Sequence, residues 1–481
     1  MKIPFLGGAY EGRSSNVSPE TCINLFYEKG VSGEALVGTA GSTVLTAGTS
    51  TLEEEVRGGI AYNDLAYFVI GNTLYEINSA GTATSRGTLN TSTGRVSMAH
   101  NGVRPSANQQ IMIVDGTDGW IYDNTTSTLS EITDTDFVAS ESVVFIDGYF
   151  VFSQAGGSDR FWLTSQYDGT AIDANDFATA EGWPDAIQTL IADNRELFIF
   201  GEETLEVWYN SGDTDNTFQR YQGGFKQHGC VAKHSPARFD NSVVWLSRNE
   251  RGDSQVVRLG EGHMPRIIST PELNYKFSQY GNVEDAFGYA YQDEGHEFYV
   301  LTFPSEGATW AYDASTQQWH QRAHEISGTF PSRERYNCHV FAFGKHLFGD
   351  FANGNIYQMD NTVGTFNGAV LERERTSIPV SDEENKRRMA SIQLDMEEGI
   401  GDGATADDDV FWLSYSKNGG HTFSNEIARS AGDGGQWSKR VIWRKLGWGR
   451  NWIFRIRTWT PKRPIIKGLI ALAAGESAKV R

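Results

Sequence analysis

IQTLIADNRELFIFGEETLEVWYN, residues 187–210, carries the pattern that decides the fold. Two apolar runs flank the polar pair Asp193-Asn194, and a third run follows Glu202-Glu203. Short runs of this kind, cut by Asn, Asp or Gly, are typical of β-strands in hairpins, because these residues tolerate the positive φ that two-residue turns require. The segment therefore predicts consecutive antiparallel strands.

The same unit of strand, polar turn and strand recurs along the chain. Its copies occupy 58–78, 109–124, 142–154, 187–210, 237–249, 287–303 and 339–360. Their predicted turns are Asn63-Asp64, Asp115-Gly116, Asp147-Gly148, Asp193-Asn194, Asp240-Asn241, Asp293-Glu294 and Gly344-Lys345.

The first residues of successive turns are 52, 32, 46, 47, 53 and 51 positions apart. A repeat of about 40–50 residues with several strands per unit indicates a β-propeller, in which each small sheet buries its faces against its neighbours. We expect a propeller of about six to seven blades over residues 58–365. The 32-residue step indicates a shortened or miscounted blade, and unrelated hairpins packed in sandwiches remain the alternative.

The two flanks of the repeats have a different texture, although the whole chain is predicted to be all-β. Residues 1–57 predict an extended N-terminal arm with one possible strand at 21–29, which would cross between subunits or seal a blade. Residues 366–481 predict a C-terminal β-sandwich-like domain with a basic end. Its expected strands are 389–397, 409–419, 439–447 and 451–460.

The formal net charge of −20 conceals a split. Residues 437–481 contain 12 Lys and Arg and one acid, Glu476, so this segment is +11 and the remainder is −31. An acidic body repels nucleic acid and membrane surfaces at long range, whereas a basic end can dock on an acidic partner or on phosphate. The candidate interaction residues are Arg440, Arg444, Lys445, Arg455 and Arg457.

Two alternatives remain for this basic end. It is either a solvated face without a partner, or it touches DNA directly. In the second case, aromatic side chains would stack on single-stranded bases. The aromatic side chains concerned are Trp443, Trp448, Trp452 and Trp459.

Several motifs were considered as sites of chemistry, and none predicts a catalytic, cofactor or metal site. There is no P-loop, GxGxxG or GxSxG motif, and the cysteines at 22, 230 and 338 have no metal-ligand spacing. His320 and His324 are four residues apart without an HExxH motif, and the run 407–409 lacks calcium-loop spacing. A pair of glycosidase carboxylates is neither found nor excluded among 61 acids.

Two further motifs predict a hairpin and a loop but no site of chemistry. SKNGGHTF (416–423) resembles the Asp-box hairpin of sialidase-type propellers with Asn418 in place of Asp, and the tripeptide at 251–253 is a polar loop. No apolar stretch is long enough to span a bilayer, and the N-terminus lacks the apolar core of a signal peptide.

Several segments in order resemble the packaged-DNA-stabilisation, or tail-hub (nozzle), family of short-tailed bacteriophages. The most distinctive are RVSMAH (95–100) and KRVIWRKLGWGRN (439–451). The others are IPFLGG to INLFYEKG (3–30), DGTDGWIYD (115–123), ADNRELFIFGEETLEVWYNSG (192–212), HGCVAKHS (228–235), MPRIISTPELN (264–274) and WAYDASTQQWHQ (310–321).

The resemblance implies a non-enzymatic virion protein without a cofactor, assembled in the host cytoplasm into the tail. It implies a ring of six copies below the portal and its adaptor ring that continues the DNA channel, helps to retain packaged double-stranded DNA, and contacts the tail needle or plug and the fibres or spikes. No membrane insertion is implied. The competing function is a carbohydrate-active propeller enzyme or lectin, with acids and aromatics in a central pocket.

Overall fold

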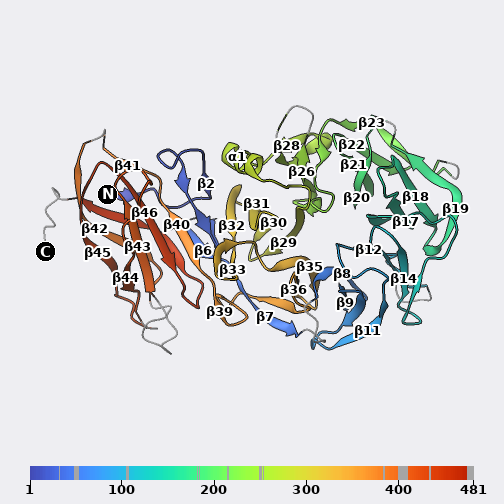
Figure 1. Cartoon of the computed structure of the whole chain (residues 1–481), viewed down its shortest axis with the longest axis horizontal. Helices are drawn as coiled ribbons and strands as arrows, with labels where there is room; N and C mark the ends of the chain where they lie inside the picture. Colours follow the sequence, from blue (N-terminus) through green and yellow to red (C-terminus); the bar gives the residue numbers. More distant parts are fainter. Residues whose placement is uncertain are drawn as a thin grey trace.

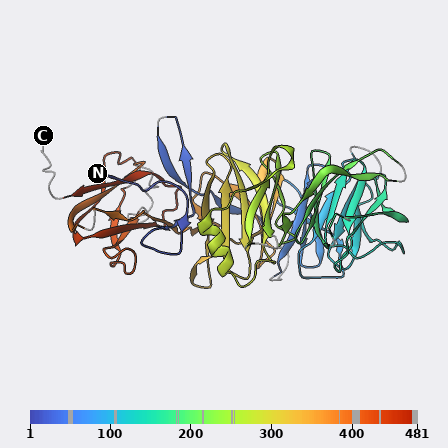
Figure 2. The same cartoon turned by 90° about the horizontal axis from the view of Figure 1, so that it is seen from above.

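The computed structural model describes residues 1–31, 33–47, 54–103, 108–180, 182–183, 185–213, 216–248, 252, 254–382, 385–398, 410–432 and 435–473. Its strands form a seven-bladed β-propeller and a β-sandwich, which lie side by side (Figures 1 and 2). Both parts were expected from the sequence, and the blade count is the upper of the two values predicted.

Four antiparallel strands make up each of the first four blades. Blade 1 contains β8 (Val56–Tyr62), β9 (Leu65–Ile70), β10 (Thr73–Ile77) and β11 (Ala83–Thr88). Blade 2 contains β12 (Ser97–His100), β13 (Gln110–Val114), β14 (Gly119–Asp123) and β15 (Thr128–Glu131). Blade 3 contains β16 (Val143–Ile146), β17 (Tyr149–Ser153), β18 (Arg160–Ser165) and β19 (Asp168–Thr179). Blade 4 contains β20 (Ile187–Asp193), β21 (Glu196–Gly201), β22 (Leu205–Asn210) and β23 (Phe218–Lys226).

The last three blades complete the ring with strands from distant parts of the chain. Blade 5 contains β24 (Gly229–Cys230), β25 (Ala237–Phe239), β26 (Ser242–Arg248), β27 (Gln255–Leu259) and β28 (Pro265–Ile267). Blade 6 contains β29 (Phe287–Asp293), β30 (His296–Phe303), β31 (Ala308–Asp313) and β32 (Gln318–Arg322). Blade 7 contains β35 (Tyr336–Ala342), β36 (Lys345–Asp350), β37 (Ile356–Asp360) and the N-terminal strand β7 (Gly41–Thr46).

The first and second strands of six blades are joined by two-residue turns in which both central residues have positive φ. This geometry matches the twist of the flanking strands, which explains why Asn, Asp and Gly recur there. In three turns the central pair lies one residue away from the predicted pair. The observed pairs are Asn63-Asp64, Asp147-Gly148, Asn194-Arg195, Asp240-Asn241, Glu294-Gly295 and Phe343-Gly344.

The 32-residue step in the sequence repeat is a miscount. Asp115-Gly116 joins β13 to β14, the second and third strands of blade 2, whereas the other predicted turns join first and second strands. The equivalent connection in blade 2 runs from β12 to β13 and contains residues 104–107, which lie outside the described residues. Blade 2 is therefore a full four-stranded blade.

Every pair of neighbouring blades shares an apolar cluster, so the ring is held by seven similar interfaces. The interface between blades 7 and 1 closes the ring, and it packs Val56 and Phe68 against Val340 and Leu347. The fourth strand of blade 7 is β7, which pairs with β37 and is followed in the same sheet by the short strands β38 and β39. A strand that precedes blade 1 in the sequence thus completes the last blade.

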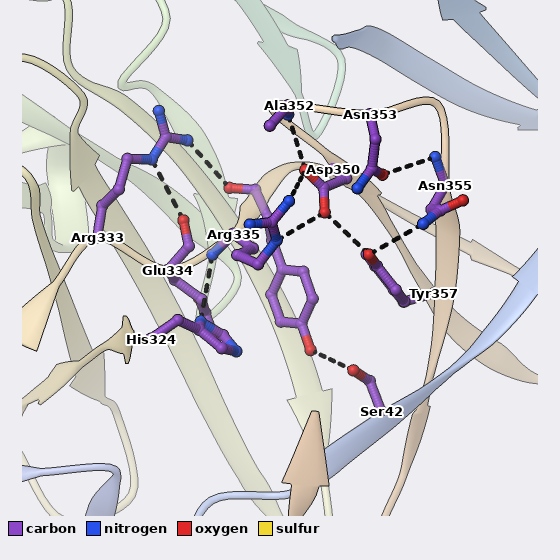
Figure 3. Close-up of polar contacts among 11 residues, drawn as sticks. Ser42, His324, Arg333, Glu334, Arg335, Asp350, Ala352, Asn353, Asn355 and Tyr357 are labelled. Atoms are coloured by element: carbon purple, nitrogen blue, oxygen red, sulfur yellow. Dashed lines mark hydrogen bonds and ion pairs between the residues drawn. The ribbon is translucent and has the colours of Figure 1, made fainter. Parts of the chain in front are cut away.

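A buried polar network surrounds this closure (Figure 3). Arg335 donates two hydrogen bonds to the buried carboxylate of Asp350, from Nε at 2.9 Å and Nη2 at 3.0 Å. The Tyr357 hydroxyl donates to the same carboxylate at 2.9 Å, and the Tyr336 hydroxyl lies 2.8 Å from Ser42 Oγ on β7. Because the buried Asp350 carboxylate is paired in this way, it stabilises the closed ring, whereas an unpaired buried charge would destabilise it.

The C-terminal domain consists of two packed sheets. The first sandwich sheet has the order β45-β42-β47-β6-β5, with β1 on β47, and the second has the order β40-β46-β43-β44, with β41 on β46. The first sheet contains β1 (Lys2–Ile3), β5 (Leu25–Lys29), β6 (Glu34–Gly38), β42 (Arg387–Met396), β45 (Val441–Gly449) and β47 (Ile465–Ala473). The second contains β40 (Arg373–Thr376), β41 (Val380–Ser381), β43 (Val410–Ser416), β44 (Ile427–Ser430) and β46 (Asn451–Thr458).

The N-terminal arm connects the two domains within one chain. Its strand β4 (Cys22–Ile23) pairs in parallel with β32 of blade 6 and antiparallel with β40 of the sandwich, so one sheet continues from the propeller into the sandwich. The arm strands β1, β5 and β6 extend the first sandwich sheet. The arm seals a blade, as one of the two expectations had it, and it also bridges the domains (Figure 1).

The remaining elements are short. They are β2 (Tyr10–Glu11), β3 (Pro19–Glu20), β33 (His324–Ile326), β34 (Thr329–Ser332), β38 (Thr365–Phe366), β39 (Ala369–Val370), the 3-10 turn Glu261–His263 and the helix α1 (Pro271–Gln279). Helix α1 begins with Thr270 as its N-cap, whose hydroxyl accepts from the Leu273 amide. In the described part of the chain, no helix has the length and apolar character needed to cross a membrane.

Candidate functional site: the basic sandwich face and the propeller axis

The five predicted interaction residues do not form one surface. Arg440, Arg444 and Lys445 lie in and just before β45, at the edge of the first sandwich sheet. Arg455 and Arg457 lie on β46 of the second sheet. The structure therefore divides the basic segment between two sheets of the sandwich.

The β46 arginines are engaged within the chain. Arg457 forms an ion pair with Glu372 and another with Glu426 at 2.9 Å, and its Nε lies 3.5 Å from Glu374. Burial alone would lower the pKa of Arg457, but the hydrogen bond to Glu426 and the neighbouring carboxylates outweigh burial and raise it. Arg455 lies over the ring of Phe423, 3.9 Å from its centroid. These two side chains serve the packing of the domain.

The β45 residues are free by contrast. Arg440, Arg444 and Lys445 are exposed, and none of them contacts a carboxylate among the described residues. Arg388, also exposed, lies opposite Trp448 in the register between β42 and β45. We call the set of Arg388, Arg440, Arg444, Lys445, Trp437 and Trp448 the β45 surface.

Two of its members are large apolar side chains, since Trp437 is 69% and Trp448 is 58% exposed. Exposed tryptophans beside arginines are typical of protein interfaces, where both residue types are enriched. Trp443 and Trp452 are buried in the sandwich core, and the indole of Trp459 donates to Glu372 at 3.2 Å. Three of the four tryptophans considered for base stacking are therefore already engaged.

The centre of the propeller is crossed by a side chain. Arg95 precedes the innermost strand of blade 2, and its guanidinium carbon lies 3.9 Å from the ring centroid of Phe287 on blade 6. It also donates to Oδ1 and O of Asn337 on blade 7, at 3.2 and 2.6 Å. Blades 2 and 6 are not neighbours in the ring, so these contacts span the axis. The propeller is closed at this level.

A hollow of about 490 Å³ lies between blades 4 and 5. Its carboxylates are those of Glu202, Glu203 and Glu284, and its cations are Lys233 and Arg248. Its lining among the described residues contains no aromatic side chain, which a glycan-binding pocket would use to stack sugar rings. The Arg248 and Glu284 charges face each other at 3.9 Å.

The other motifs noted in the sequence have structural places. Asn418 accepts from the Thr422 amide and donates to its hydroxyl, so the 416–423 segment forms the Asp-box type of turn, and Ser15 of the arm docks on Gly419. His320 and His324 make separate contacts, with Arg322 and with the Arg335 amide. No group of three His, Cys, Asp or Glu suited to a metal occurs within the described ranges. The runs at 407–409 and 251–253 fall on residues outside them, apart from Gly252.

Sequence reasoning missed the axial residues. RVSMAH was singled out as distinctive, yet the part played by its first residue, Arg95, was not foreseen. A charged residue directly before an apolar strand ordinarily indicates a solvated strand end. No signal in the sequence distinguishes Arg95 from such a residue, because its partners Phe287 and Asn337 are 192 and 242 positions away.

Comparison with solved structures returns matches at low similarity. The N-terminal domain of Nup159 matches with a TM-score of 0.41 and 10% identity over 66% of this chain and 95% of that one. U3-55K matches with a TM-score of 0.42 and 10% identity over 66% and 98%. PorZ of the Porphyromonas gingivalis type-IX secretion system matches at 0.36 and 12%, and this chain spans only 44% of its length.

Comparison with curated protein sequences finds no match. Two protein-family models do match, and together they cover most of the chain. The model described as bacteriophage P22 Gp10, beta-propeller, matches residues 1–364, and the model described as bacteriophage P22 Gp10, beta-sandwich, matches residues 373–472. The chain thus belongs to the bacteriophage P22 Gp10 family of podovirus tail proteins, which confirms the resemblance found in the sequence and makes it a structural protein of a phage tail.

Proposed function

We propose that this protein is the tail hub, or nozzle, of a short-tailed phage. Six copies would form a ring below the portal and its adaptor, continue the DNA channel and help to retain the genome. The ring would also offer attachment surfaces to the needle or plug and to the fibres or spikes. Assembly would take place in the host cytoplasm, without membrane insertion and without a cofactor.

The observation that carries this proposal is the β45 surface. It places four exposed cations, none of which pairs with a carboxylate among the described residues, and two exposed tryptophans on the sandwich, in a chain whose residues 1–436 carry −31. Opposite charges on two ends of one molecule favour association with an acidic ring, which can be the adaptor or the next copy. Arg440, Arg444 and Lys445 would make this contact, whereas Arg455 and Arg457 would support it by keeping the sandwich intact.

The closed axis adds a constraint on the channel. Because Arg95 spans the centre of the propeller, DNA would not thread through a single copy but would pass through a lumen lined by several copies. An acidic lumen would repel phosphate and let the duplex slide. A lumen with positive potential in a reconstruction of the assembled tail would contradict this part of the proposal.

The competing carbohydrate-binding function gains no support from these features. It would require acids that converge at the centre, where Arg95 and Arg333 lie against Asn337 and the ring of Phe287 and form no ion pair with a carboxylate among the described residues. The hollow between blades 4 and 5 has acids but no aromatic lining among the described residues. We therefore retain the tail-hub proposal.

The test mixes the purified protein with its cognate portal and adaptor and follows assembly by light scattering and negative-stain imaging. The wild-type chain should give six-fold rings, and Arg444→Glu/Lys445→Glu should give particles that lack them. The matched control is Arg195→Glu/Arg266→Glu, which reverses two exposed arginines on the propeller. Equal assembly of the β45 variant would reject the docking surface, and no wild-type ring would reject the hub.

A further inference from the structure

Two arginines meet at the propeller axis on opposite sides of the ring closure. Arg95 comes from blade 2, and Arg333 from the segment that leads into blade 7. Nη1 of Arg95 and Nη2 of Arg333 each lie 3.2 Å from Oδ1 of Asn337. The two guanidinium carbons also lie 3.9 and 5.4 Å from the same ring centroid of Phe287, so the two cations are immediate neighbours.

Neither of them has a counter-charge in contact. Among the described residues, Arg95 donates to Asn337 alone, and Arg333 also donates to Asn337. Arg333 donates in addition to the carbonyls of Glu334 and Tyr336, at 3.2 and 3.4 Å (Figure 3). No carboxylate forms an ion pair with either residue among the described residues. The guanidinium groups of Arg95 and Arg333 therefore repel each other, because the protein interior screens charge poorly.

Other buried or half-buried arginines of this protein have a carboxylate partner or more hydrogen bonds. Arg335 is paired with Asp350 through two hydrogen bonds. Arg373 lacks a carboxylate but donates four bonds to main-chain carbonyls, and Arg57 donates four bonds to carbonyls and a hydroxyl. With five N–H groups and one partner residue, Arg95 keeps donors available for a further acceptor.

This arrangement disfavours the charged form of both guanidinium groups. Burial lowers the pKa of both Arg95 and Arg333 to about 10, and the charge of Arg95 contributes to lowering that of Arg333. The carboxylates of Glu55, Asp285 and Asp350 act on the pair at longer range and offset only part of this effect. Both guanidinium groups remain charged at neutral pH.

We propose that the axial pair Arg95 and Arg333 binds one compact inorganic oxyanion of the phosphate or sulfate class. Fork-shaped guanidinium groups match the oxygens of such an anion, and two of them give a short, charge-assisted set of hydrogen bonds. Arg333 is only 8% exposed, so the site admits a free ion in preference to a group carried on a macromolecule. The bound anion would neutralise the pair and join blade 2 to blades 6 and 7.

Inorganic phosphate is the probe for the test. The full chain is dialysed into Tris chloride, and phosphate is added at constant ionic strength while binding is followed by equilibrium dialysis and unfolding by calorimetry. We expect one phosphate per chain and a Tm that rises with the logarithm of phosphate concentration above saturation. Arg95→Gln and Arg333→Gln should each weaken binding at least about tenfold, which is the worth of a charge-assisted contact.

The matched control is Arg195→Gln, which removes an exposed arginine of blade 4 and should leave phosphate binding unchanged. Crystals of the wild-type chain soaked in selenate give a readout without any substitution, because anomalous scattering locates the ion directly. Selenate between Arg95 and Arg333 supports the site. The proposal would be overturned if selenate bound only at other places or if phosphate binding did not saturate. It would also be overturned if Arg95→Gln and Arg333→Gln both bound phosphate as tightly as the wild-type chain does.

Discussion

Ile23 of the N-terminal arm lies in parallel register with Gln321 of blade 6, and its other edge pairs with Glu374 of the sandwich. Two residues of β4 thus carry one sheet across the boundary between the two domains. The two domains are therefore joined by main-chain hydrogen bonds as well as by side-chain packing, and their relative position is fixed by the arm.

Asn24→Ala should uncouple the domains. Nδ2 of Asn24 donates to the carbonyls of Ala323 and Glu372, at 2.7 and 2.8 Å, and its Oδ1 accepts from the Ala323 amide at 2.9 Å. Asn24 also has a φ of 53°, which Ala adopts with strain. The loss of three bonds should lower the free energy of unfolding by about 3 kcal/mol.

Urea denaturation followed by intrinsic fluorescence measures this effect. Asn24→Ala should split a single transition into two, because the propeller and the sandwich then unfold separately. Asn175→Ala is the control, since Asn175 is exposed and its side chain donates to Asp173 of the same strand, β19. A single unshifted transition in Asn24→Ala would contradict the role given to β4.

Asp350→Ala should open the ring closure. Asp350 is fully buried and accepts from Arg335, Tyr357 and the Ala352 amide. Its removal leaves the Arg335 charge without a partner, which costs about 3–5 kcal/mol. Asp382→Ala breaks the exposed pair with Arg387 and should cost less than about 1 kcal/mol. Calorimetry should rank the two variants in this order.

Substitutions of the β46 arginines and of the basic residues of the β45 surface should differ in their effect on stability as well as on assembly. Arg457→Ala removes the cation of half-buried Glu372, leaves buried Glu374 with Arg455 alone, and should cost about 1–3 kcal/mol. Arg444→Ala removes an exposed side chain and should change the free energy of unfolding by no more than about 0.5 kcal/mol. Equal melting temperatures for the two variants would show that the β46 pairs contribute nothing.

Stability should fall when the solution is acidified below about pH 6.5. Burial is the main cause that lowers the pKa of His234, His324 and His339 to about 3, and nearby cations add to it. Unfolded histidine titrates near about 6.5, so the unfolded chain binds protons that the folded chain does not, and each residue costs up to about 1.4 kcal/mol per pH unit.

His296 affects the pH dependence of stability in the opposite direction. Its hydrogen bond to Asp313 raises its pKa, so its contribution to stability is lost as the pH rises. Burial also lowers the pKa of His228, His320 and His346, so histidines with a lowered pKa outnumber His296 and the net histidine contribution is a loss of stability toward acid. Melting curves between pH 7.5 and 5 should show it, and His339→Gln should make the slope shallower. A flat profile in this range would contradict the burial of these side chains.

The three cysteines should be inert in the native protein. Burial raises the pKa of Cys230 to about 12 and that of Cys338 to about 11, and it also raises the pKa of Cys22. The thiolate is the reactive form, so a disulfide reagent such as DTNB at pH 8 should modify none of them until denaturant is added. Rapid native reaction of one thiol would indicate local opening of its blade.

The fold could be predicted to the level of architecture because its signal is local. Turns such as Asp147-Gly148 and Asp240-Asn241 combine positive φ with flanking apolar strands, and this combination is visible in about ten residues. The signal failed in blade 2, where the first hairpin is a longer connection and the second, at Asp115-Gly116, took its place in the count. Local turn chemistry gives the spacing of blades but not which hairpin of a blade carries it.

The arm and the site depended on contacts that no short segment encodes. Cys22 and Ile23 form a two-residue strand whose partners are more than 290 and 350 positions away, so no alternation pattern marks it. In the basic segment, composition located Arg444 and Arg457 equally well. Only the three-dimensional structure distinguishes them, because Arg457 on β46 pairs with acids from other segments, whereas Arg444 is exposed.

The use of β7 as the fourth strand of blade 7 has a consequence for synthesis. Residues 41–46 leave the ribosome early, but their partner strand β37 ends at residue 360, about 314 residues later. At about 5–20 residues per second the nascent propeller stays open for roughly 15–60 s, with its first strand unpaired. The ring can therefore close only after synthesis has passed residue 360.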